Sequence, residues 1–151
     1  MRTPKNTTRH ASLWATLLLA TPFAAAATKP PQWHRVGKAG AVEIFIDRAS
    51  IRYDRGTPLD KEGDRRKVHI LYSHDATQKD LKGGSFRSET FVDEISCARR
   101  TVTTLSTVQF AGQRGDGAVV LRHKVGVRLA QPIMPGTFNE HIMETYVCET
   151  E

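Results

Sequence analysis

Two cysteines, Cys97 and Cys148, are the residues whose chemistry this sequence constrains most strongly. A thiol pair can form a disulfide, contribute to a metal site or supply a nucleophile. The chain starts with a segment typical of export, described below, and exported proteins reach an oxidising compartment. We therefore expect a Cys97–Cys148 disulfide; the alternative is two free buried thiols.

The remaining candidates for catalysis or metal binding form no known motif. Histidines that could bind a metal are not spaced by four residues along a helix, and no His-Glu-x-x-His sequence occurs. No Gly-x-Ser-x-Gly nucleophile motif or phosphate-binding glycine loop is present. The sequence therefore predicts no enzyme, no metal site and no cofactor, with a small hydrolase or metal binder as the alternative. The histidines after residue 27 are His34, His69, His74, His123 and His141.

The first 27 residues have the pattern of a secretory signal peptide. Basic residues precede a short apolar run at Ala11–Ala20, and small residues follow at 24–27. The run is too short and alanine-rich for a membrane anchor. We predict a signal peptide at 1–27 and one exported domain at 28–151, without a transmembrane segment.

Removing this leader changes the charge of the chain. The sequence has 22 Lys and Arg against 16 Asp and Glu, and residues 1–27 hold three of the basic residues and no acidic ones. The exported domain therefore carries 19 basic and 16 acidic residues. This small excess argues against nucleic acid as a partner, because nucleic-acid binding needs a dense basic face.

A binding surface is the remaining kind of functional site. The residues we predict to bind a protein partner are Lys82, Arg87, Arg99 and Arg100, with Arg122 and Lys124 sharing one face of a later strand. Such cations could meet acidic glycans or acidic stretches of a protein. The alternative is an ordinary solvated polar face. The tripeptide Arg114-Gly115-Asp116 matches an integrin-recognition motif, but its residues are also common in turns.

Alternating apolar residues predict about six strands. Hairpin-length connections between most of them favour an antiparallel meander. We expect a tight turn at 47–51 and polar loops at 53–66 and 74–84. Within 85–97 the apolar residues change from one face of the strand to the other, a switch of parity that predicts a bulge there or burial on both faces. The expected strands are 33–36, 41–47, 67–73, 85–97, 101–110 and 118–125.

One helix is predicted at the C-terminus. Thr137 and Glu140 have the spacing of a capping box, and Phe138, Ile142 and Tyr146 fall on one face. A helix this short is marginal alone. We expect an α+β fold in which the disulfide holds the helix against the apolar face of the sheet.

Five segments in consistent order resemble the surface-adhesin protein E family of proteobacterial exported domains. They span Trp33 to Cys148. The segments are Trp33-x-x-Val36, Ile44-Phe45-Ile46-Asp47-x-x-Ser50-Ile51, Arg87-Ser88, Cys97-Ala98-Arg99-Arg100, and Pro135-Gly136-Thr137 with Val147-Cys148.

The resemblance implies an antiparallel sheet with a C-terminal helix held by the Cys97–Cys148 bond. It also implies a non-enzymatic, adhesin-like protein in the periplasm or on the surface of a Gram-negative cell. A protein partner such as host extracellular matrix is expected, and a homodimer is compatible with it. The alternative is a periplasmic structural or envelope-associated domain that never meets a host.

Overall fold

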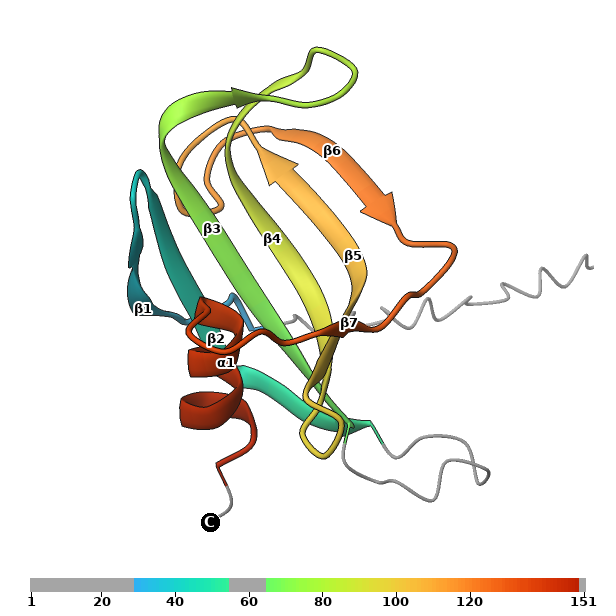
Figure 1. The fold of residues 1–151 in the computed structure, drawn as a ribbon. Helices are drawn as coiled ribbons and strands as arrows, with labels where there is room; N and C mark the ends of the chain where they lie inside the picture. The colour runs from blue at the N-terminus through green and yellow to red at the C-terminus, as the bar shows by residue number, and fades with distance from the viewer. Residues whose placement is uncertain (1–28, 55–64, 150–151) are drawn as a thin grey trace, which may run out of the picture.

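The computed structural model describes residues 29–54 and 65–149. The predicted signal peptide lies outside these residues, as does most of the predicted loop at 53–66. Within them, six strands pair in sequence order as an antiparallel meander, and a short seventh strand pairs with the start of β5. The predicted architecture is confirmed (Figure 1). The strands are β1 (Trp33–Ala39), β2 (Val42–Asp54), β3 (Arg65–Lys79), β4 (Ser85–Ser96), β5 (Thr101–Phe110), β6 (Val119–Lys124) and β7 (Gln131–Pro132).

The turn predicted at 47–51 lies inside β2 as a bulge. The Asp47 carboxylate accepts from the Ala49 backbone N–H at 3.1 Å. The Ser50 hydroxyl donates to the Asp47 carbonyl at 2.6 Å and accepts from the His69 backbone N–H at 2.8 Å. Because these bonds satisfy the displaced backbone, the strand continues and pairs with β3 again beyond the bulge.

The loop predicted at 74–84 was wrong over its first half, because β3 continues through polar residues to Lys79. The register shifts between Ser73 and Gln78, opposite Arg87 of β4. Only residues 80–83 form the turn, where the Asp80 carboxylate accepts from two backbone N–H groups. Pairing with β4 therefore overrides the polar composition of this segment.

The parity switch in 85–97 comes from burial on both faces of β4, one of the two predicted explanations: Ser88 is 0% exposed and Ile95 on the other face is 1% exposed. The register shifts next to Val92 and Asp93, but the extra residue is Leu105 of β5, so the bulge lies in the neighbouring strand and not in β4.

The C-terminal helix begins as predicted and ends differently. Thr137 caps α1 (Phe138–Ile142) by accepting from the Glu140 backbone N–H. The Glu140 carboxylate accepts from the Gly136 N–H, one residue earlier than in a standard capping box. The chain then widens into the π-helical turn η1 (Met143–Val147), in which the Cys148 N–H donates to the Met143 carbonyl at 2.7 Å.

This helix packs over one end of the sheet and builds the main core. Figure 1 shows α1 in front of β2, toward the lower part of the sheet. The wider turn places Met143 and Val147 beside Ile142 in the core, while the predicted Phe138 and Tyr146 are half-buried. The buried core residues are Ile44, Ile46, Val68, Ile70, Ile95, Ile133, Ile142, Met143 and Val147.

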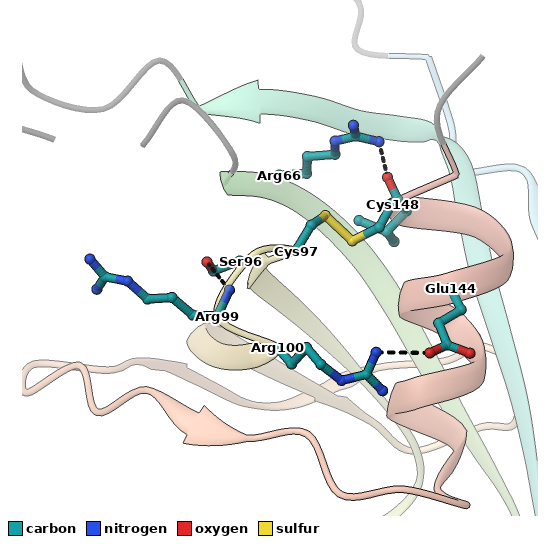
Figure 2. Close-up of a disulfide and its surroundings, with 8 residues drawn as sticks. Arg66, Ser96, Cys97, Arg99, Arg100, Glu144 and Cys148 are labelled. Carbon is teal, nitrogen blue, oxygen red and sulfur yellow. Dashed lines mark hydrogen bonds and ion pairs between the residues drawn. A yellow bond between two sulfur atoms is a disulfide. The ribbon is translucent and has the colours of Figure 1, made fainter. Parts of the chain in front are cut away.

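A disulfide, two ion pairs and a hydrogen bond hold the helix to the sheet, and Figure 2 shows all of them except the pair with Glu140. Cys97 and Cys148 form the predicted disulfide, with their Cα atoms 5.7 Å apart. The Arg100 guanidinium pairs with Glu144 at 2.8 Å and also with Glu140. The Arg66 guanidinium donates to the Val147 carbonyl. The tail is therefore fixed along its length from the β4–β5 turn and from β3.

Loss of the disulfide should destabilise the fold. The bond closes a loop with a sequence separation of 51 residues. In the chain-entropy model such a loop contributes about 4 kcal/mol. We expect reductant, or the Cys97→Ser/Cys148→Ser double variant, to lower the melting temperature. Reductant should not change the melting temperature of the double variant. An unchanged melting temperature for the reduced wild type would contradict the prediction.

Gly37 should tolerate no side chain. A Cβ atom there would lie 2.7 Å from the Phe138 ring, so that ring, or the helix that carries it, would have to move. We expect Gly37→Ala to cost about 1–3 kcal/mol of unfolding free energy. Denaturant unfolding would measure this, with Gly126→Ala as the control because nothing lies within 4 Å of a Cβ there. Adding Phe138→Leu should recover part of the loss; equal stability of Gly37→Ala and wild type would refute the close contact.

Candidate functional site

The four predicted partner-binding residues lie at opposite ends of the sheet. Lys82 and Arg87 belong to the β3–β4 hairpin and the start of β4, while Arg99 and Arg100 form the β4–β5 turn. β4 spans twelve residues, which corresponds to roughly 40 Å of extended chain. The structure therefore does not bring the four residues together into one site.

The side chains of Arg100 and Arg87 make contacts within the chain. Arg100 pairs with the helix, as described above. The Arg87 guanidinium donates to the Asp75 carbonyl at 2.8 Å, across the irregular part of β3. Lys82 is exposed at the hairpin, and the Arg99 side chain is exposed and points away from the helix (Figure 2). Lys82 also lines a cleft.

This cleft, which we call the hairpin cleft, lies on the part of the sheet beyond the helix. It has a volume of about 520 Å³. Its walls come from the β3–β4 hairpin and from β4, β5 and β6, whose alternating residues share one face. It is lined by Lys79, Asp80, Leu81, Lys82, Phe86, Glu89, Phe91, Thr107, Gln109, Leu121 and His123.

The polar atoms on the floor of the hairpin cleft are mainly acceptors. The Glu89 carboxylate lies 3.4 Å from His74 Nε2 and accepts from Gln109 Nε2, also at 3.4 Å. The Gln109 residue is only 9% exposed, and its Oε1 atom has no hydrogen-bond partner among the described residues. A buried carbonyl without a partner costs free energy, so a donor from outside would be favourable once the Gln109 side chain turns toward the cleft.

Two groups beside this floor have raised pKa values. Burial, and then the charges of Asp93 and Glu89, raise the pKa of Tyr72 to about 12, so its hydroxyl stays protonated. Burial raises the pKa of Asp93, and a hydrogen bond from the Thr104 hydroxyl opposes that change. Tyr72 also packs against the Phe91 ring, with 5.2 Å between the ring centroids. This packing gives the cleft an aromatic wall.

Sequence analysis did not single out Glu89, Gln109 or Leu121. The alternation of apolar and polar residues along β4, β5 and β6 predicts which residues of one strand share a face. It could not show that these faces meet, because the β5 register depends on the unpaired Leu105.

The Arg114-Gly115-Asp116 loop folds back onto the sheet face opposite the helix. The Arg114 guanidinium lies 5.7 Å from the centre of the Phe45 ring and pairs with Glu43 at 3.3 Å. The Gly115 N–H donates to the buried Ser88 hydroxyl at 2.9 Å. These contacts give the tripeptide a structural role as a cover for this face.

The described residues also limit other kinds of site. Nowhere in 29–54 or 65–149 do three His, Cys, Asp or Glu residues gather as a metal site would require. No helix in these two segments is both long and apolar enough to cross a membrane.

The chain is similar in fold to solved structures of Haemophilus influenzae protein E. One is 18% identical, has a TM-score of 0.53, and covers 82% of this chain and 96% of that chain. Another, from non-typeable Haemophilus influenzae, is 20% identical and has a TM-score of 0.50. The match covers 77% of this chain and 78% of that chain. No curated protein matches this sequence.

The profile of the family described as surface-adhesin protein E matches residues 33–149. This range includes all seven strands, the helix and both cysteines. The chain therefore belongs to the surface-adhesin protein E family.

Proposed function

We propose that this protein is an exported, non-enzymatic adhesin that holds a segment of a protein partner, a host extracellular matrix protein, in the hairpin cleft. Membership of a surface-adhesin family supports the adhesin role. The observation that carries the site is the Gln109 side chain: the residue lines the cleft, and its buried carbonyl lacks a partner among the described residues, so a turn of this side chain toward the cleft would present an unused acceptor.

The chemistry of the hairpin cleft indicates what the segment must contain. Gln109 Oε1 and the Glu89 carboxylate both accept hydrogen bonds, so the segment must bring N–H donors. Phe86, Phe91 and Leu121 supply apolar walls that suit the stem of a long side chain. A side chain that ends in an amide, ammonium or guanidinium group satisfies both requirements.

The rim of the hairpin cleft can add contacts at little conformational cost. The Leu81 side chain is fully exposed at the hairpin, beside Lys82. An exposed leucine next to a binding cleft provides apolar area that a partner can cover. Among the four cations predicted from the sequence, we therefore place Lys82 in the interface first, with Arg87 next to it in the hairpin region.

Replacing Gln109, whose carbonyl lacks a hydrogen-bond partner among the described residues, should weaken partner binding without destabilising the fold. We expect Gln109→Leu to bind immobilised matrix proteins about tenfold more weakly, because the donor of the partner loses its acceptor. The melting temperature should not fall, since the variant removes an unpaired buried carbonyl. Leu81→Ser and Lys82→Glu should weaken binding as well.

Arg99→Gln is the matched control for this experiment, because Arg99 lies at the far end of β4. Weaker binding by Arg99→Gln, with full binding by Gln109→Leu, would move the interface to the β4–β5 turn. Size-exclusion chromatography of the same samples would show whether the protein is a monomer or a homodimer.

Surface display follows from the proposed role and can be measured on intact cells. We expect external protease to cut the protein, or antibody to bind it, without opening the outer membrane. Protection until that membrane is permeabilised would contradict the adhesin role and favour a periplasmic envelope domain.

A further inference from the structure

We propose that β6 and the loop after it dock on an anionic lipid surface. We call this region the basic edge. Its groove borders the hairpin cleft, since Thr107 and His123 line both, but Arg122, Lys124 and Arg128 line the groove and not the cleft. These three residues are its cations, and its exposed aliphatic residues are Val119, Val127 and Leu129.

The charge of the basic edge has one sign. From Gly117 to Asn139 the sequence contains no Asp or Glu. Arg122, Lys124 and Arg128 line one groove of about 450 Å³ beside β5, and no carboxylate lines it. Within the described part of the chain, none of these three cations makes an ion pair. The groove is therefore complementary to phosphate groups.

Exposed aliphatic side chains accompany these cations. Val127 is 77% exposed and Leu129 is 66% exposed, and they flank Arg128 in sequence. Three of the six exposed large hydrophobic residues among those described, Val119, Val127 and Leu129, belong to the basic edge. Surfaces that bind membranes at the interface combine cations for the headgroups with aliphatic residues for the acyl boundary.

The backbone of the basic edge fits the headgroup region and not the hydrocarbon core. β6 is the edge of the sheet opposite β1 (Figure 1), and in the described chain it pairs only with β5. An unpaired strand edge needs hydrated partners. After Val125, whose N–H still bonds to β5, the loop leaves the sheet and is exposed from residue 126 to 130. We infer that this loop enters the interface while β6 stays among phosphates.

The residue types favour a lipid surface over other polyanions. Nucleic acids are commonly held by aromatic stacking, and protein interfaces are enriched in aromatic residues. Residues 117–137 contain no Phe, Tyr or Trp. A soluble polyanion would use the cations but gain nothing from exposed Val127 and Leu129.

Sedimentation with vesicles tests this proposal on the exported protein. We expect binding to vesicles that contain phosphatidylglycerol, weak binding to pure phosphatidylcholine, and loss of binding in high salt. Arg122→Glu/Lys124→Glu should lower the partition coefficient about tenfold or more. Lys79→Glu/Lys82→Glu changes the net charge equally at the hairpin and should leave vesicle binding unchanged.

A second variant separates lipid from soluble polyanions. Val127→Ser/Leu129→Ser keeps every charge and should weaken vesicle binding, while binding to heparin stays the same. Unchanged vesicle binding by this variant, or equal losses in the two charge variants, would overturn the proposal. Neither edge variant should alter matrix-protein binding, so failure here is distinguishable from failure of the proposed function.

Discussion

The fold depends on covering the apolar face of one sheet with a helix of only ten residues. A helix of this length is not stable alone in water, so its position must come from tertiary bonds. The chain supplies a covalent bond at Cys148, ion pairs from Arg100 and a hydrogen bond from Arg66. The segment before the helix is fixed too, because the Ile133 N–H donates to the Arg100 carbonyl at 2.8 Å. The β4–β5 turn thus anchors both sides of the helix.

Because the helix is short, it leaves part of the sheet uncovered, and the hairpin cleft lies on that part. The helix covers the ends of β2, β3 and β4 that contain the main core, and it does not reach the hairpin end. The face left beyond it must therefore contain residues that tolerate water. Glu89, Gln109 and Thr107 lie there among aromatic and aliphatic walls. This explains why polar residues follow the core positions along the same faces of β4 and β5.

Much of this fold was predictable from local pattern, and the exceptions share one cause. Alternation in β2 and β5, the Thr137 cap and the cysteine pair each depend on near neighbours or on the exporting compartment. The continuation of β3 to Lys79 depends on pairing with β4, which the polar sequence of 74–79 does not reveal. The π-helical turn that buries Val147 is equally non-local, since the sheet and the disulfide position it.

Charge was the weakest guide to the site, for a physical reason. Arginine can bind a partner or hold its own fold, and composition does not distinguish the two. Arg100, at a backbone φ of 51°, faces two helix carboxylates, and Arg87 faces a backbone carbonyl, so each is committed within the chain. Arg122, Lys124 and Arg128 lie in the segment 117–139, which contains no Asp or Glu, and no carboxylate lines their groove. A run of cations without nearby acids is therefore a better indicator of an external anionic partner than cations scattered among potential internal partners.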